Sequence, residues 1–284
     1  MSIDQRALLV ELNISTWTAN KLDRGKTDQI LHDSKAGNRA GKFHKNLMAG
    51  TSLVKDLSDY AAQCRTWNNK QTLPWKDKGP RAVPTSLYLE YKKGINERCV
   101  TFWDKVEGVV QGYEAAKHTA RLHLGDLYNP DDYPHAEQVR AKYGWDFETN
   151  MIPKSGHFMV DVPAEELAEM QESCEARVNE RFKEAMQEAW GRLHSMCAEM
   201  SKKLTENEDD KKKKRWHDSF ISNPLELCAL LSHLNVTNDP DLERARAQLE
   251  QTIQGADIET IKDSAATREA LKRDVDSIID QYEW

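Results

Sequence analysis

The residues with the clearest chemical potential are the basic and aromatic side chains of the N-terminal third. From Lys21 to Arg98 there are 16 Lys and Arg and 8 Asp and Glu, so this segment carries +8 while the whole chain carries −7. Cations that neutralise phosphates, interleaved with aromatic rings that stack on bases, are what binding of single-stranded nucleic acid requires. The candidate contact residues are Trp75, Lys76, Lys78, Arg81, Arg39, Lys42, Lys45 and Trp67. The alternative is that basic helices pack beside acidic ones.

The most constrained part of this segment is the connector Thr72–Pro84, which holds three prolines and Gly79. Proline fixes its own φ and disfavours helix at the residue before it, so no helix can run through the connector. We expect a shaped loop that aims the helices on either side, with Trp75 and Arg81 presented to a partner. The open alternative is that Trp75 packs across two helix ends and Arg81 pairs with a carboxylate such as Asp77 or Glu90.

Catalytic and metal-binding patterns are weak. The stretch Gly37–Phe43 resembles a phosphate-binding loop, but it is one residue short and Phe43 stands where a hydroxyl must meet magnesium. His118 and His123 lie five apart on an expected helix, which places them on different faces. No Cys-x-x-Cys pair is present among the five cysteines. The sequence therefore predicts no enzyme, no cofactor and no metal site.

The elements that position these residues are mostly helices. Apolar residues recur at steps of three and four in three long segments, and they alternate in a strand at 7–17. The expected helices span 43–64, 86–127, 163–204, 220–234, 241–253 and 258–282. We predict a mainly α fold: a long antiparallel helical pair or bundle of coiled-coil type, pairing 86–127 with 163–204. A small β-sheet combines the N-terminal strand with a hairpin near 145–162, and a C-terminal helical segment follows.

The expected domain organisation follows the charge pattern. A helical rod with the small sheet covers 1–206, a charged hinge covers 207–219, and a C-terminal helical subdomain covers 220–284. No apolar run approaches the roughly 20 residues of a membrane span, and the N-terminus has no signal pattern. We therefore expect a cytoplasmic protein with no membrane partner.

Three short motifs carry a resemblance to a known family. They are Val10-Glu11-Leu12-Asn13-Ile14-Ser15-x-Trp17, then Leu73-Pro74-Trp75-x-Asp77-x-Gly79-x-Arg81-x-x-Pro84, then Leu124-Gly125-Asp126-Leu127-Tyr128. In this order they resemble a family of uncharacterised tailed-bacteriophage proteins, known as a domain of unknown function. The resemblance implies a phage origin and the cytoplasm of an infected bacterium, and it supplies no catalytic residues. Some members look to be encoded near AAA-type ATPases, which implies an adaptor role.

Two functional hypotheses follow. The first is a non-enzymatic phage protein that acts by protein–protein contact, as a homo-oligomer or as an adaptor to a phage or host protein, with host takeover or counter-defence as its context. The second is a single-stranded nucleic-acid-binding protein of phage replication or recombination that uses the basic N-terminal third.

Overall fold

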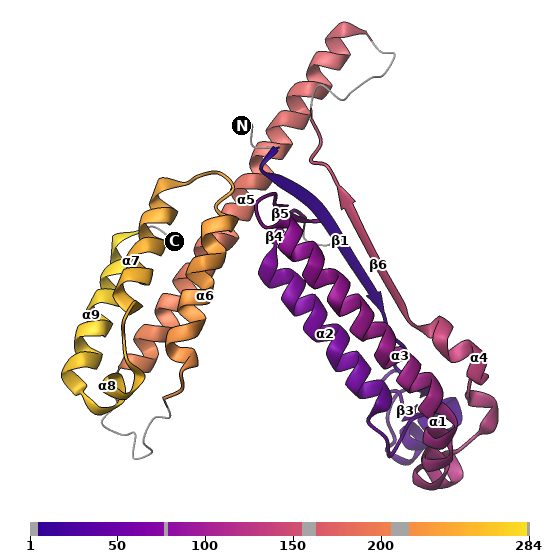
Figure 1. Cartoon of the computed structure of the whole chain (residues 1–284). Helices are drawn as coiled ribbons and strands as arrows, with labels where there is room; N and C mark the ends of the chain where they lie inside the picture. The colour runs from indigo at the N-terminus through magenta and orange to yellow at the C-terminus, as the bar shows by residue number, and fades with distance from the viewer. Residues whose placement is uncertain (1–4, 77–78, 155–162, 206–215, 283–284) are drawn as a thin grey trace. The chain divides into compact units, whose positions relative to one another are not determined.

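The computed structural model describes residues 5–76, 79–154, 163–205 and 216–282. The chain is 67% helical with a small antiparallel sheet, which confirms the mainly α fold class (Figure 1). The helices in the described residues are α1 (Arg24–Asp33), α2 (Leu53–Gln71), α3 (Tyr88–Leu124), α4 (Ala136–Val139), α5 (Ala164–Leu204), α6 (Ser219–Leu234), α7 (Pro240–Ile253), α8 (Ile258–Asp263) and α9 (Ala265–Gln281). The strands are β1 (Ala7–Ser15), β2 (Asn20–Leu22), β3 (His44–Asn46), β4 (Leu73–Pro74), β5 (Arg81–Pro84) and β6 (Gly144–Asn150).

The connector Thr72–Pro84 forms two short strands of the larger sheet, whose order is β4-β5-β1-β6. β1 pairs antiparallel with β5, from Ala7 opposite Pro84 to Val10 opposite Arg81. The expected union of the N-terminal strand with the segment near 145 is confirmed, because β6 lies next to β1. The second strand of the expected hairpin, near 157–162, lies outside the described residues.

The chain divides into two compact units. Unit 1 comprises residues 1–11, 69–91 and 148–284, and unit 2 comprises residues 12–68 and 92–147. This division differs from the boundaries at 206 and 220 expected from charge, and most of the expected hinge lies outside the described residues. The helices after residue 218 belong to the same unit as α5 because they share its hydrophobic core.

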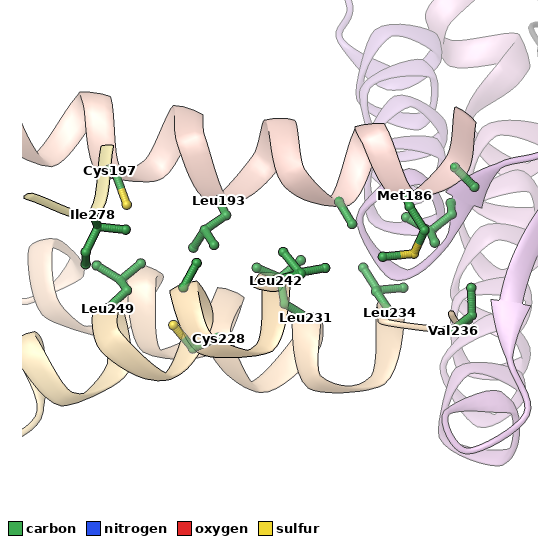
Figure 2. Packing of buried hydrophobic residues seen from close by; sticks show 14 of the residues in the cluster. Met186, Leu193, Cys197, Cys228, Leu231, Leu234, Val236, Leu242, Leu249 and Ile278 are labelled. Carbon is green, nitrogen blue, oxygen red and sulfur yellow. The ribbon is translucent and has the colours of Figure 1, made fainter. Parts of the chain in front are cut away.

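The core of unit 1 forms along one face of α5. Leu193 and Cys197 are fully buried, and they pack among Leu231 of α6, Leu249 of α7 and Ile278 of α9 (Figure 2). The apolar positions of α5 recur every three or four residues, so a single helix face supplies this contact. Burial of these side chains is the main force that holds α6, α7 and α9 against α5.

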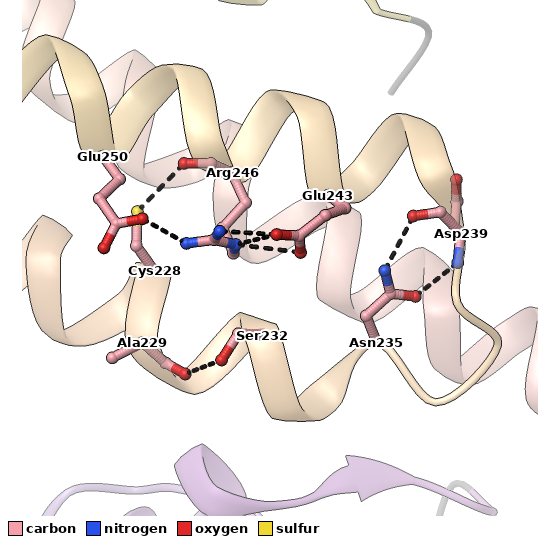
Figure 3. A network of polar contacts seen from close by, with 8 residues as sticks. All are labelled: Cys228, Ala229, Ser232, Asn235, Asp239, Glu243, Arg246 and Glu250. Atoms are coloured by element: carbon pink, nitrogen blue, oxygen red, sulfur yellow. Dashed lines mark hydrogen bonds and ion pairs between the residues drawn. The ribbon is translucent and has the colours of Figure 1, made fainter.

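A polar network fixes α6 and α7 to each other (Figure 3). The Cys228 thiol of α6 donates to the Arg246 carbonyl of α7 at 3.6 Å, and the Arg246 guanidinium makes ion pairs with Glu243 and Glu250 within α7. The Asn235 side chain both donates to the Asp239 carbonyl and accepts from the Asp239 amide, at 2.8 and 2.7 Å. The turn between the helices is therefore closed by one side chain whose donor and acceptor are both used.

The core of unit 2 joins α2 to α3. The buried residues of α2, from Val54 to Cys64, belong to one cluster with those of α3, from Phe102 to Ala120. The predicted pairing of helix 86–127 with helix 163–204 is therefore wrong. The buried face of α3 packs with α2, while that of α5 packs with α6, α7 and α9. Periodicity predicts that a helix has a packed face, but it does not identify the element that covers it.

The expected helix start at Phe43 is also wrong, because α2 begins at Leu53 and residues 44–46 form β3. Gly50 explains the difference. Its φ is +82°, and a Cβ at this position would lie 2.3 Å from the His123 ring. Glycine reaches this left-handed conformation at no steric cost, so the position marks a turn and not a helical seam.

Candidate interaction surface

The structure buries Trp75, the residue most prominent among the expected contacts. Its side chain is 6% exposed and belongs to the core of unit 1. The ring stands edge-on to Phe182 of α5, with centroids 5.2 Å apart and planes at 78°. The ring is therefore a packing group in this structure, whereas the expectation was a ring presented to a partner. The alternative is met only in the burial of Trp75, because the ring lies on Phe182 within α5 and not across two helix ends. Lys76 beside it is exposed, and Lys78 lies outside the described residues.

Arg81 donates hydrogen bonds to backbone carbonyls at the C-terminal end of α2. Its Nε donates to the Thr72 hydroxyl at 2.6 Å, and its Nη2 donates to the carbonyls of Thr72 and Asn69. Arg192 of α5 donates to the carbonyls of Asn69, Lys70 and Thr72 at 2.8–2.9 Å. The last carbonyls of a helix have no partners within the helix and attract cations. Burial, and then the neighbouring Arg192, lower the pKa of Arg81.

Replacing Arg192 with Met tests this assignment. We expect a loss of about 2 kcal/mol in the free energy of unfolding, because the Lys70 carbonyl loses its donor while Arg81 still reaches the other two. Urea denaturation followed by circular dichroism measures it. Arg181→Met is the matched control on the same helix, since the half-buried Arg181 makes an i,i+3 ion pair with the exposed Glu184. Equal effects of both changes would contradict the capping role.

The expected basic contact surface is divided between exposed and buried cations. Arg39 and Lys42 are exposed. Lys45 is 7% exposed, and its ammonium lies 2.5 Å from Asp132 and 3.6 Å from Asp23 while donating to the Leu127 carbonyl at 2.9 Å. The pKa of Lys45 is raised, mainly because its ammonium is hydrogen-bonded to the carboxylate of Asp132. The prediction that Lys45 contacts phosphate is wrong, because its charge is neutralised inside unit 2.

Trp67 lines a surface cavity of about 440 Å³ between α2 and α3. The Arg98 guanidinium lies 3.8 Å from the centre of its ring. The cavity is lined by Tyr60, Gln63, Cys64, Trp67, Glu97, Arg98 and Thr101. Burial raises the pKa of the Cys64 thiol, so the cavity offers no thiolate nucleophile at neutral pH. The side chains that line it offer two aromatic rings, two hydroxyls, an amide, a thiol and one charge of each sign.

A third surface, which the sequence analysis missed, runs along the exposed side of α3. We call it the outer face of α3, and all of its residues are exposed: Val100, Asp104, Gly108, Gln111, Ala115, His118 and Leu122. The exposed fractions of Val100 and Leu122 are 62% and 74%. Gln111 lies nine residues, two and a half turns, from both Phe102 and Ala120 of the core, so this face points away from α2.

The outer face is bordered by Glu107 and Glu114, which lie as close to the direction of Gln111 as Ala115 and Gly108 do on the other side. Asp104 is the only Asp, Glu, Lys or Arg among its seven positions, whereas 31% of all residues are of these types. The steps between positions are four, four, three, four, three and four, the spacing of a coiled-coil seam. This spacing was available in the sequence, but the stronger apolar seam of the same helix conceals it.

No other site emerges from the part of the chain that the structure describes. It contains no cluster of three or more His, Cys, Asp or Glu side chains that could hold a metal ion. None of the helices in the described ranges is both long and apolar enough to cross a membrane. No protein-family model matches the chain, and no curated protein and no solved structure shows significant similarity to it.

Proposed function

We propose that this chain is a non-enzymatic protein that acts by protein–protein contact, as a homo-oligomer or an adaptor, in the cytoplasm of a bacterium infected by a tailed phage. The observation that supports the proposal is the outer face of α3, where exposed apolar and small residues recur at coiled-coil spacing. The large apolar residues of this face, Val100 and Leu122, lie at its two ends, and the small residues Gly108 and Ala115 lie between them. We also propose that this contact is a coiled coil, which is the arrangement that the sequence predicts.

The state of the thiols also favours a contact protein over an enzyme with a cysteine nucleophile. Burial raises the pKa of Cys197 to about 12 and that of Cys228 to about 11. It also raises the pKa values of Cys64 and Cys99. A thiol reacts as its thiolate, so at neutral pH these four side chains are packing groups.

Size-exclusion chromatography with light scattering tests the proposal. We expect a mass that is a multiple of 32.6 kDa, or a stable complex with a phage or host protein captured by the tagged chain. The same run with a fluorescent single-stranded oligonucleotide tests the nucleic-acid alternative. A monomer that captures nothing would contradict the proposal. Co-elution with the oligonucleotide that fades as salt rises would replace it with nucleic-acid binding.

A further inference from the structure

We propose that the surface cavity between α2 and α3 binds a small organic anion, whose carboxylate or phosphate is held by the guanidinium of Arg98. The cavity has a volume of about 440 Å³, and small-molecule sites typically have volumes of roughly 300–1,000 Å³. This inference goes beyond the proposed contact function and does not rest on it. It is carried by a cation that is fixed at the cavity, keeps unused hydrogen-bond donors and has no carboxylate partner among the described residues.

Arg98 is held in place on the wall of the cavity. Its guanidinium lies over the Trp67 ring, 3.8 Å from the centre, and its Nη1 donates to the Gly94 carbonyl at 3.0 Å. Gly94 also lets the Trp67 ring rest against α3, because a Cβ at this position would lie 2.6 Å from the ring. The attraction between the cation and the ring adds to the hydrogen bond. A cation that is fixed before the ligand arrives loses little freedom on binding.

The guanidinium keeps the strongest unused donors at the cavity. Within the described residues, Arg98 forms no ion pair, and the Gly94 carbonyl accepts its one hydrogen bond. The two hydroxyls at the cavity already donate to α3: Tyr60 to the Arg98 carbonyl at 3.4 Å, and Thr101 to the Glu97 carbonyl at 3.1 Å. A guanidinium presents its N–H groups in a planar fork that matches a carboxylate or a phosphate.

The charges around the cavity favour an anion over a cation. Glu97 is the only carboxylate among the lining residues, and the Lys93 ammonium lies 4.0 Å from it. The Lys105 ammonium lies 5.4 Å from the centre of the Tyr60 ring. Together with Arg98 these side chains supply three positive charges against one negative charge. Since a local excess of one sign raises the concentration of ligands of the other sign, the cavity attracts anions.

Two rings of α2 provide the surface for the body of the ligand. Tyr60 and Trp67 lie seven residues apart, close to two helical turns, so both are on the side of α2 that faces α3. Burial raises the pKa of the Tyr60 hydroxyl, so this side chain is neutral at pH 7 and does not repel an anion. The cavity therefore suits a carboxylate or phosphate that is carried on a flat apolar group.

Nuclear magnetic resonance titration with benzoate, phenyl phosphate and benzamide tests the site. We expect benzoate or phenyl phosphate to shift the indole N–H signal of Trp67 with a dissociation constant of roughly 1 mM, as is reasonable for ligands of this size. Trp67→Phe identifies the signal by its loss. The neutral benzamide should bind at least about fivefold more weakly, because it lacks the charge that Arg98 recognises. Equal binding of benzamide would overturn the assignment.

Arg98→Met removes the proposed recognition group. We expect the dissociation constant of the tighter anion to rise about tenfold or more. Arg121→Met is the matched control, because the Arg121 guanidinium also lies over a ring, 5.9 Å from the centre of Tyr128, and it does not line the cavity. Urea denaturation of both variants shows that each is folded. Equal affinity of the two variants would contradict the role of Arg98.

Glu97→Gln changes the affinity in the opposite direction, which a folding defect does not imitate. Loss of the carboxylate leaves the cavity with positive charges alone, so the anion should bind about threefold more tightly. Glu114→Gln, an exposed change on α3 outside the cavity, should leave the dissociation constant unchanged. Weaker binding by Glu97→Gln, or no difference from the control, would contradict the charge argument.

The outcomes separate this inference from the proposed function. If neither benzoate nor phenyl phosphate shifts the Trp67 signal at about 10 mM, the anion site is wrong, whereas the mass of the protein and its capture of partners still decide the contact function. If one of them binds and Arg98→Met weakens it, the site is supported whether or not the protein forms oligomers. The tighter of the two probes shows whether the site prefers a carboxylate or a phosphate.

Discussion

Trp75→Ala is expected to lower the free energy of unfolding by about 3–5 kcal/mol. The side chain is 6% exposed in the core of unit 1 and stands edge-on to Phe182. Removing the ring takes away its buried apolar area and the aromatic contact, and it leaves a cavity that β4 and α5 can only partly close. Urea denaturation followed by circular dichroism measures the loss.

Two further variants show whether the loss comes from packing. Trp75→Phe should cost less than Trp75→Ala, because it keeps an aromatic ring in the same space. Lys76→Ala should change stability by less than about 0.5 kcal/mol, since the adjacent side chain is exposed. If Trp75→Ala were as stable as the wild type but lost binding to a partner, Trp75 would be a contact residue after all.

Lys45→Met is expected to cost about 3 kcal/mol. Removing one member of a buried ion pair leaves the other charge without compensation, which costs about 3–5 kcal/mol. The lower end applies because Lys21 remains 3.5 Å from Asp132. Lys42→Met is the matched control, since Lys42 is an exposed lysine three residues away. Thermal and urea unfolding of the two variants should differ clearly, and equal stability would contradict the buried pair.

The effect of Lys45 should also depend on pH. Its pKa is raised in the folded state, so its ion pairs stabilise the fold below the unfolded pKa of about 10.4. This contribution is lost as the pH rises through the higher folded value. The stability difference between wild type and Lys45→Met should therefore be constant between pH 7 and 9 and shrink above pH 10.5. A difference that grew with alkaline pH would contradict the sign of this shift.

Sequence patterns predicted the two longest helices, although they placed a helix start at Phe43, immediately before β3 of the structure. Apolar spacing predicted helices at 86–127 and 163–204, and the structure has α3 at Tyr88–Leu124 and α5 at Ala164–Leu204. The largest error is three residues, at the end of α3. Proline and glycine chemistry predicted that no helix runs through the connector Thr72–Pro84. These features depend on neighbouring residues alone, because a helical face repeats every 3.6 residues and proline acts on its own backbone.

Which helix faces meet, and which charged side chains stay exposed, depends on contacts between distant segments. The sequence could not show that α3 packs with α2, because any long apolar seam fits another. It could not separate Lys42 from Lys45, since the burial of Lys45 depends on Asp132, which lies 87 residues further along the chain. Trp75 and Arg81 stand in one connector, yet one fills a core and the other caps a helix, because Phe182 and the end of α2 lie beside them. Contacts between distant segments set burial, and burial decides whether a polar or aromatic side chain can act on a partner.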